Sequence, residues 1–519
     1  MDAMTDIQYY SFFFFVSIIT TLLIRSILNK PTKQTASLHL PPSPPALPLI
    51  GHLHLLTPFL YKPFHSLSNQ YGPLLYLRFG SARCLLVSSA AVASEIFKSQ
   101  DLSFSSRPIF AFADKLQYNN SGFITAPYGD YRRFMKKLCV TKLFATKQLE
   151  VSRGIRREEI ERLLRKVVES ARKNENVDVG AEVMKLTNNV TCRVVMSARC
   201  SEQDGEAEKV RDLVKESFEL AAKLCFGDVL GPLKKLGRFD ELLERVLKEH
   251  EERRKRNGSV REDKDSMDIL LDIYQDEEAE VKITRTHIKA FFLDLFIAGT
   301  DTSAEGMQWV MAELINHPCV FNKVREEIES VVGKTRLVEE SDIPNLSYLE
   351  AVVKETLRLY PPGPVTTTEC RDNCKINGYD IPEKTAVAIN PYAIMRDPDL
   401  WDDPNEFRPE RFLVSVNEQE KLDQCQVEGK GQSFNFVPFG AGRRGCPGTT
   451  LAFSMMNTAV AALVQCFDWK VSGEGDGTKV DMQSGPGMSL HVFYYCDVLL
   501  ENMFSRGMLF WTYGRVHND

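Results

Sequence analysis

The residues with the clearest chemical potential are Phe439–Gly448, which read Phe-Gly-Ala-Gly-Arg-Arg-Gly-Cys-Pro-Gly and present Cys446 just before an apolar run, 449–467. A thiolate at the start of a helix is favoured by the helix dipole and by backbone N–H groups. Arg444 adds a fixed cation beside it. Three glycines are expected to turn the backbone with positive φ and to admit a flat partner: Gly442, Gly445 and Gly448. This combination suits an axial ligand to haem iron.

Two other interpretations of this loop are open. Gly440–Gly445 also matches G-x-G-x-x-G, the dinucleotide-binding fingerprint, but arginines and a Cys-Pro pair interrupt the turn, and only about 75 residues follow it. A structural turn with a buried free cysteine is the second interpretation, and it would be favoured for an isolated Cys-Gly pair. Five matched positions between Phe439 and Gly448 make a chance occurrence rare.

A long helical pattern, Thr286–Asn316, ends before Pro318. Its centre reads Phe-Ile-Ala-Gly-Thr-Asp-Thr-Ser over residues 296–303. Placing a glycine, an acid and several hydroxyls in the middle of a buried apolar helix costs stability, so a functional reason is expected. A helix break with a solvent-facing aspartate is the simpler alternative.

The chemistry available at this centre is proton transfer. We expect the Thr302 hydroxyl to donate a hydrogen bond to the carbonyl oxygen of Ala298, which bends the helix locally. Gly299 would leave space beside the bend, and Asp301 would supply protons. Activation of oxygen on iron requires open space, a hydroxyl and an acid of this kind.

A carboxylate–arginine set follows. Glu355 and Arg358 share one face of a helix that ends at Pro361, and Arg411 comes about 50 residues later within Phe407–Phe412. A surface ion pair is the simpler interpretation of Glu-x-x-Arg alone. In this order along the chain, we expect a buried network that fixes the cysteine-bearing loop. Breaking it should cost on the order of several kcal/mol, because charges would be stranded.

These ordered motifs resemble those of the haem-thiolate monooxygenases, the cytochromes P-450, and the resemblance covers residues 1 to about 490. It implies a mainly α fold with a small β portion behind an N-terminal membrane anchor. It also implies haem b as cofactor, O2 and a small lipophilic substrate, and electrons from NADPH through a separate reductase. The chain shows no credible flavin or nicotinamide site of its own.

The resemblance also implies roles for individual residues. Cys446 corresponds to the axial iron ligand, and Asp301 and Thr302 to the proton-delivery pair. Haem contacts are implied for Arg444, Lys136, Phe439, Gly442, Gly448, Ala298 and Gly299. The structural network corresponds to Glu355, Arg358 and Arg411. Substrate-pocket positions are implied for Phe123, Phe226, Val365, Thr366 and Met488.

Three features depart from the family pattern. Arg132 stands where a tryptophan is expected, within a basic segment, Tyr131–Lys137, that is read as a solvated helix face or as a reductase-docking face. Thr368 stands where an arginine would contact a haem propionate. The tail from His491 lacks the expected proline-containing close, and we hypothesise an altered gene end such as a retained intron. We therefore expect haem to be retained but held less tightly.

The N-terminal segment predicts a membrane anchor. Residues 7–24 are uncharged, with acidic residues before them and Arg25, Lys30 and Lys33 after them. This flank predicts a catalytic domain in the cytosol, and a cleaved signal peptide is the alternative. We expect a single-pass anchor at residues 1–30 in the endoplasmic reticulum membrane, a proline-rich hinge at 31–51 and a catalytic domain at 52–519.

Composition and the rest of the sequence limit the partners and the compartment of the protein and predict further elements. The net charge of −6 argues against a nucleic-acid partner. Twelve cysteines have no C-x-x-C spacing, and only Cys370 and Cys374 lie close together, which fits a reducing compartment. The patterns predict short strands at 74–79 and 84–87, a helix at 153–173 and another at 206–224, a loop at 225–239 and a charge-dense connector at 248–276.

The hinge, Ala126–Tyr131 and 436–444 resemble the plant cytochromes P-450 of specialised metabolism. We expect a monooxygenase that oxidises a lipophilic plant secondary metabolite, a triterpenoid first and a flavonoid next. A haem-thiolate isomerase or dehydratase is one alternative, against which the Asp301–Thr302 pair speaks. A haem-binding protein impaired by its departures from the pattern is the other.

Overall fold

The computed structural model describes residues 9–21, 38–56, 60–108, 118, 121–173, 175–197, 233–257, 264–413, 434–471, 479–483 and 497–501. The chain divides into two compact units. The first comprises Met1–Pro108 and Val365–Ile394, and the second Ile109–Pro364 and Met395–Asp519. Each unit is therefore assembled from segments that lie far apart in the sequence.

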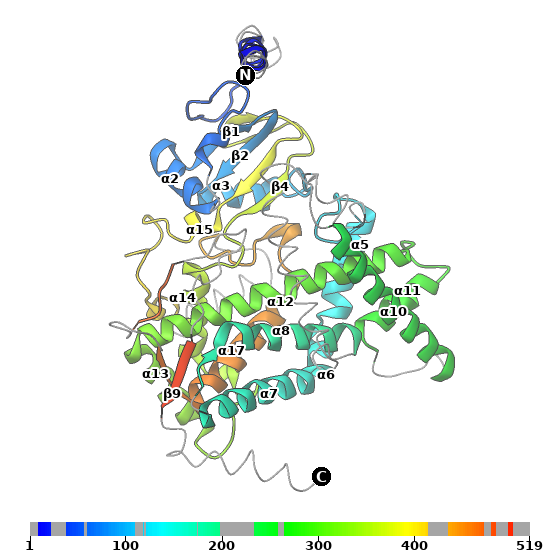
Figure 1. Cartoon of the computed structure of the whole chain (residues 1–519), viewed down its shortest axis with the longest axis vertical. Coiled ribbons are helices and arrows are strands. Elements are labelled where there is room, and N and C mark those ends of the chain that lie inside the picture. Colours follow the sequence, from blue (N-terminus) through cyan, green and yellow to red (C-terminus); the bar gives the residue numbers. More distant parts are fainter. Residues whose placement is uncertain are drawn as a thin grey trace, which may run out of the picture. The chain divides into compact units, whose positions relative to one another are not determined.

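The first unit contains a four-stranded sheet in the order β1-β2-β7-β4, in which blue and yellow strands lie side by side (Figure 1). β1 and β2 form an antiparallel hairpin, β7 joins β2 in parallel, and β4 is antiparallel to β7. Leucines of β1 and β2 pack against Phe64 to form a core. The elements are α2 (Tyr61–Tyr71), β1 (Leu74–Phe79), β2 (Ala82–Val87), α3 (Ala90–Ser94), β4 (Thr366–Glu369), β5 (Cys374–Ile376), β6 (Tyr379–Ile381), β7 (Ala386–Ile389) and α15 (Pro391–Ile394).

The second unit is mainly helical and is built around α12 (Arg285–Asn316). α12 packs on α8 and α17, and α7 packs on the same two helices (Figure 1). Thr284 and His287 form a capping box at its start, and Pro318 begins the next helix after its end. The other helices are α5 (Asp130–Leu138), α6 (Thr146–Val151), α7 (Arg153–Arg172), α8 (Val179–Met196), α10 (Leu233–Asn257), α11 (Ser266–Gln275), α13 (Pro318–Val332), α14 (Ser347–Leu359) and α17 (Thr449–Cys466).

The end of the chain contributes to a three-stranded sheet of this unit. Its order is β3 (Val177–Asp178), β9 (Asp497–Glu501) and β8 (Asp468–Val471). Val498 lies opposite both Val177 and Val471. The atypical tail therefore supplies the central strand of a sheet, although its sequence shows no clear period.

The mainly α architecture with a small β portion is confirmed, and most predicted elements lie within two residues of their expected bounds. One expectation was wrong, because the predicted loop at 225–239 is helical from Leu233. The charge-dense connector at 248–276 contains the end of α10 and all of α11. Leu243, Val246, Leu247 and His250 are buried at helical spacing, so α10 is amphipathic.

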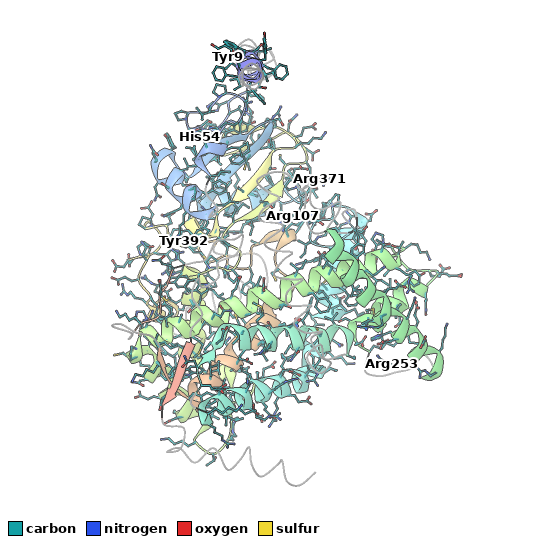
Figure 2. All side chains as sticks on the ribbon, viewed as in Figure 1. Tyr9, His54, Arg107, Arg253, Arg371 and Tyr392 are labelled. Carbon is teal, nitrogen blue, oxygen red and sulfur yellow. The ribbon has the colours of Figure 1, made fainter. Side chains whose placement is uncertain are left out.

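The apolar N-terminal segment forms a helix over Tyr9–Thr21, with Tyr9 exposed (Figure 2). Among the described residues, one helix is long and apolar enough to cross a membrane by length and composition, Thr449–Cys466, and 61% of it is buried in the fold. That helix is a core element. The predicted helix at 206–224 and the candidate pocket residues Phe226 and Met488 lie outside the described residues.

Candidate functional site

The loop before α17 is closed by a hydrogen bond from the Cys446 N–H to the Phe439 carbonyl oxygen, at 3.0 Å. The Phe439 ring packs against Phe453 of α17, with centroids 5.1 Å apart. Residues Gly442–Arg444 form a 3₁₀ turn between these two points. The cysteine is thus held at the start of α17, as the sequence predicts.

The glycines of this loop serve different purposes. Gly440 and Gly442 have φ of +66° and +63°, a region that favours glycine. The expectation of positive φ is wrong for Gly445 and Gly448, whose φ values are −55° and −94°. Gly445 is favoured for space instead, because a Cβ there would lie 3.2 Å from the Gly442 carbonyl oxygen, closer than most side-chain contacts.

The Cys446 side chain is exposed to solvent, yet protein atoms crowd around its sulfur, and this desolvation raises the pKa of the thiol. The Gly448 N–H, 3.4 Å from Sγ, and Lys136 both oppose this shift. The direction is opposite to the favoured thiolate of the sequence analysis, because desolvation outweighs both contributions. A cation bound at Sγ is what would favour the thiolate here.

Two cations predicted to contact a cofactor hold this loop in place. Lys136 of α5 donates a hydrogen bond to the Gly445 carbonyl oxygen at 2.5 Å. Arg444 donates to the carbonyl oxygens of Ile124 at 3.2 Å and Ala126 at 2.7 Å. Sequence reasoning missed Ile124 and Ala126, because backbone acceptors leave no side-chain signal.

Lys136 occupies an electrostatically unfavourable position. Burial lowers its pKa, and Arg132 one turn earlier on α5 lowers it further. The nearby thiols of Cys446 and Cys139 act in the opposite direction. An ammonium in this position would be stabilised by an anionic partner.

Arg132 is buried and lies over an aromatic ring, with its guanidinium carbon 3.9 Å from the Phe123 centroid. This cation–π contact stabilises the arginine at the position where the family resemblance implies a tryptophan. Phe123 itself is buried in a core cluster and lies 6.0 Å from the Phe291 ring. It lies beneath Arg132 among apolar side chains, and its place in the substrate pocket stays a prediction.

The basic segment of α5 combines the two sequence interpretations. Arg133 pairs with Asp130, and Lys137 pairs with Glu280 at 2.9 Å, and all four side chains are exposed. These two cations form a solvated face. Arg132 and Lys136 instead point into the unit, because their positions three or four residues apart share the inner face of the helix.

The centre of α12 carries an accessible strip in a helix that is otherwise mostly buried. Ala298 is exposed and Thr302 half-buried, whereas Phe296 and Thr300 are buried. The Thr302 hydroxyl donates to the Ala298 carbonyl oxygen at 2.6 Å, as predicted. Asp301 is buried, with 7% of its surface exposed, so the solvent-facing alternative is excluded.

Gly299 meets a packing requirement that the sequence did not indicate, and its place beside the cofactor stays a prediction. A Cβ at this position would lie 3.2 Å from the Thr191 hydroxyl oxygen of α8. The glycine therefore permits close packing of α12 on α8. The sequence could not distinguish this packing requirement from space reserved for a ligand, because both need the smallest side chain.

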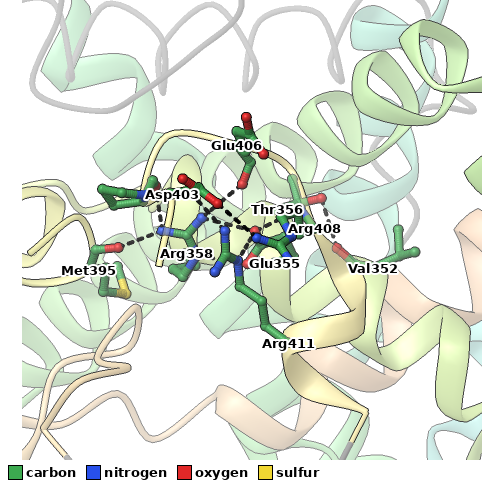
Figure 3. Close-up of polar contacts among 10 residues, drawn as sticks. Val352, Glu355, Thr356, Arg358, Met395, Asp403, Glu406, Arg408 and Arg411 are labelled. Carbon is green, nitrogen blue, oxygen red and sulfur yellow. Dashed lines mark hydrogen bonds and ion pairs between the residues drawn. The ribbon is translucent and has the colours of Figure 1, made fainter. Parts of the chain in front are cut away.

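Glu355, Arg358 and Arg411 form the predicted network (Figure 3). Arg358 binds Glu355 through two bonds, Nε to Oε2 at 2.7 Å and Nη2 to Oε1 at 2.9 Å. Arg411 Nε donates to Glu355 Oε1 at 3.1 Å. Glu355 and Arg358 are fully buried, so the surface-pair interpretation is excluded.

The network holds a different segment from the expected one. Its remaining donors bind carbonyl oxygens of Met395, Asp403, Pro404 and Glu406, and the Arg408 N–H donates to Glu355 (Figure 3). Among the described residues, the hydrogen bonds of the network to other segments therefore end on residues 395–408 rather than on the cysteine loop. That loop is held by Lys136 and Arg444.

Three further candidate residues lie in the first unit. Thr366 begins β4 opposite Ile389, and Val365 packs against the core around Phe64. Thr368 is buried opposite Val387, and its hydroxyl has no hydrogen-bond partner among the described residues. This hydroxyl lies at the position where the family resemblance implies an arginine.

The fold is that of a cytochrome P450. A zebra fish cytochrome P450 structure with progesterone matches at a TM-score of 0.72 and 26% identity, covering 86% of this chain and 100% of that chain. A second structure of a zebra fish enzyme, with abiraterone, matches at 0.72 and 25% identity. Fold and cysteine loop together define a haem-thiolate class of oxidoreductase.

Sequence comparisons give the family. The cytochrome P450 profile matches residues 41–492. Cytochrome P450 705A22 of Arabidopsis thaliana is 47% identical over 93% of this chain and 95% of that protein. Two Glycine max proteins, beta-amyrin 24-hydroxylase and 3,9-dihydroxypterocarpan 6A-monooxygenase, are each 42% identical over 92% of this chain and 95% of theirs. The chain belongs to the cytochrome P450 family and is a haem-dependent monooxygenase.

The residues around Cys446 fit the haem that this family uses. A solvent-accessible thiol can bind iron, and the Gly448 N–H already points at its sulfur. Arg444 of the loop and Lys136, which contacts the loop from α5, place two cations beside the cysteine, and both can bind carboxylates. The accessible strip of α12 belongs to a helix that packs on α17, which follows the cysteine.

Proposed function

We propose that this monooxygenase oxidises a lipophilic plant secondary metabolite, with a triterpenoid as the first candidate. The similarity to beta-amyrin 24-hydroxylase, 42% over nearly the whole chain, carries the proposal. The equal identity to 3,9-dihydroxypterocarpan 6A-monooxygenase favours a flavonoid-type substrate as the second candidate. The apolar Ala298 on the accessible strip of α12 suits either of them.

In this proposal the Cys446 sulfur would bind the haem iron, and the chemistry that the haem would supply when bound is activation of O2. The Gly448 N–H steadies the sulfur, while Lys136 and Arg444 hold the loop and attract the propionates of the cofactor. Because both cations are tied to backbone carbonyls, they lose little side-chain entropy when an anion binds.

Thr302 and Asp301 are proposed to manage protons. The Thr302 hydroxyl already donates to Ala298, so its oxygen lone pairs face away from that carbonyl and can accept a proton donor. Asp301, buried in the same turn of α12, is the nearest acid in the sequence and would replenish that proton.

Membrane attachment and the electron source complete the proposal. Plant relatives are typically membrane-bound. We propose that the apolar helix Tyr9–Thr21 belongs to an anchor in the endoplasmic reticulum membrane, with the catalytic part in the cytosol. Electrons would come from NADPH through a membrane reductase, and the exposed Arg133 and Lys137 of α5 would contribute to its docking.

The test is co-expression of the full chain with a plant reductase in microsomes, supplied separately with triterpenes such as beta-amyrin and with flavanones. Oxidised products are read by mass spectrometry. A hydroxylated triterpene is expected. Oxidation of flavanones alone would replace the first candidate by the second. A product with the same mass as the substrate would support an isomerase, and a product lighter by one water molecule would support a dehydratase.

A carbon-monoxide difference spectrum of the same microsomes separates a wrong substrate from a defective site. A band near 450 nm is expected for a cysteine thiolate ligand, and a band near 420 nm indicates a lost thiolate. Full haem occupancy with ordinary stability would contradict the expectation that Arg132 and Thr368 weaken haem retention.

A further inference from the structure

Two cysteines outside the candidate site lie in contact in the first unit. The sulfur atoms of Cys370 and Cys374 are 3.5 Å apart. Cys370 follows β4 and is buried, whereas Cys374 begins β5 and is half-buried. Nothing in the proposed oxygen chemistry uses either of them.

The backbone holds the two residues differently. Cys370 is fixed by two backbone bonds, its N–H to the Thr385 carbonyl oxygen at 2.9 Å and the Lys384 N–H to its own carbonyl oxygen at 2.7 Å. Cys374 is the first residue of a short hairpin strand paired with Ile381 of β6. A modest movement of Cys374 toward a fixed Cys370 would bring the sulfurs within the roughly 2.05 Å of a disulfide bond.

The pair is also chemically asymmetric. A hydrogen bond from the Cys370 thiol lowers the pKa of Cys374, and burial opposes that shift. The same hydrogen bond, together with burial, raises the pKa of Cys370. A more accessible sulfur with thiolate character beside a buried thiol matches the attacking and resolving partners of a redox-active pair.

We propose that Cys370 and Cys374 form a reversible dithiol–disulfide site that reacts with peroxides. Cys374 thiolate attacks one peroxide oxygen, the O–O bond breaks, and a sulfenic acid forms on Cys374 while the other oxygen leaves as water after protonation. The Cys370 sulfur then attacks the sulfenic sulfur, and the hydroxyl leaves with the Cys370 proton as a second water. Two thiols and one hydrogen peroxide thus give one disulfide and two waters, and a dithiol reductant reverses the change.

The sequence makes the product easy to identify. Arg371, exposed and labelled in Figure 2, lies between the two cysteines. Trypsin cleavage after Arg371 separates Leu359–Arg371, which carries Cys370, from Asp372–Lys375, which carries Cys374. A disulfide between them joins two tryptic peptides that are otherwise found apart.

The experiment treats the full-length holoenzyme with hydrogen peroxide, blocks thiols with N-ethylmaleimide and maps peptides without reduction. The joined peptide is expected, and it should disappear after treatment with dithiothreitol. In Cys370→Ser, dimedone should instead trap a sulfenic acid on Cys374. Further oxidation of Cys374 to a sulfinic acid in the wild-type chain, without the joined peptide, would overturn the proposal.

A second measurement uses the wild-type chain, so that misfolding of a variant cannot affect the result. Cys319 of α13 is exposed and provides the matched control. At pH 7, limiting iodoacetamide should modify Cys374 about tenfold faster than Cys319 despite its lower exposure, because the thiolate is the reacting form. Faster modification of Cys319 would show that exposure alone governs reactivity and that the pair has no redox specialisation.

Discussion

Two regions of the second unit use cations in opposite ways. In the network around Glu355, two arginines share one buried carboxylate, and their remaining N–H groups donate hydrogen bonds to carbonyl oxygens of residues 395–408. At the cysteine loop, Lys136 donates to a carbonyl oxygen, and its pKa is lowered by burial and by Arg132. A carboxylate compensates the first set directly, whereas the lysine bears an electrostatic cost.

The difference separates stability from ligand binding. A buried carboxylate that binds two arginines is complete without any ligand, and breaking it leaves charges uncompensated. A cation held by a neutral carbonyl gains further stabilisation when an anion arrives. The network is therefore suited to maintaining the fold, and the loop to accepting an anionic cofactor.

The largest expected effect comes from Glu355→Gln. The substitution removes the charge that Arg358 and Arg411 share, and the free energy of unfolding should fall by about 3–5 kcal/mol. Thermal unfolding of the purified chain measures the loss. Glu350→Gln, which breaks the i, i+4 pair with Lys354 on the same helix, is the control and should cost below about 1 kcal/mol. Equal losses in the two variants would refute the distinction.

A compensated pair with a titratable cation gives the second prediction. His250 of α10 lies 3.0 Å from the Asp265 carboxylate at the start of α11, and Ser197 also donates to that carboxylate. Burial opposes protonation of His250, but the bond to Asp265, the charge of that carboxylate and the bond to the Val246 carbonyl oxygen together outweigh burial and raise the His250 pKa. Burial likewise opposes ionisation of Asp265, and the bond to His250 lowers the Asp265 pKa.

The sign of the pH dependence follows. The histidine contribution is complete below its ordinary pKa of about 6.5 and is lost as pH rises through the raised value. The aspartate contribution is present above its ordinary pKa of about 3.9 and is lost as pH falls through the lowered value. Asp268 and Arg254 also lie beside the pair. Wild type should exceed His250→Gln by about 1–2 kcal/mol near pH 6 and by less near pH 9. A gap that widens from pH 6 to 9 in urea unfolding would contradict this.

Lys136→Gln is expected to change the loop more than the fold. Losing the bond to Gly445 costs about 1 kcal/mol, and removing a poorly compensated charge offsets part of that loss. Alkylation of Cys446 in the haem-free chain should become slower, because the Lys136 charge that lowers the pKa of this thiol is lost and less of the reactive thiolate remains. The band near 420 nm should grow at the expense of the band near 450 nm. Lys137→Gln, an exposed neighbour paired with Glu280, should change neither. A loss of stability as large as that of Glu355→Gln would remove the contrast.

The smallest effect on stability is expected for Thr302→Val. The change removes the bond to Ala298 and should alter the free energy of unfolding by less than about 1 kcal/mol. Product formed per NADPH consumed should nevertheless fall roughly 10²-fold if the hydroxyl transfers protons. Thr302→Ser retains the hydroxyl and should restore most of the yield. Unchanged yield in Thr302→Val would assign Thr302 to helix structure alone.

Features governed by local spacing could be predicted from the sequence. Pro318 and the polar residues before Arg285 bound α12, and the spacing of Glu355 and Arg358 places them on one face. The Thr302 bond to Ala298 is likewise a property of residues four apart in a helix. The cysteine loop could be recognised because its glycines, arginine and cysteine lie within ten residues.

Only the tertiary structure decided what these elements meet. Gly299 faces Thr191 of another helix, Arg132 lies over Phe123, and Lys136 reaches a carbonyl oxygen 309 positions away. Such partners depend on how helices cross, which residue types and spacing do not specify. The sequence by itself therefore determined the family, the helix limits and the cysteine. Packing decided which cations are compensated by carboxylates and which are left to stabilise an anionic ligand.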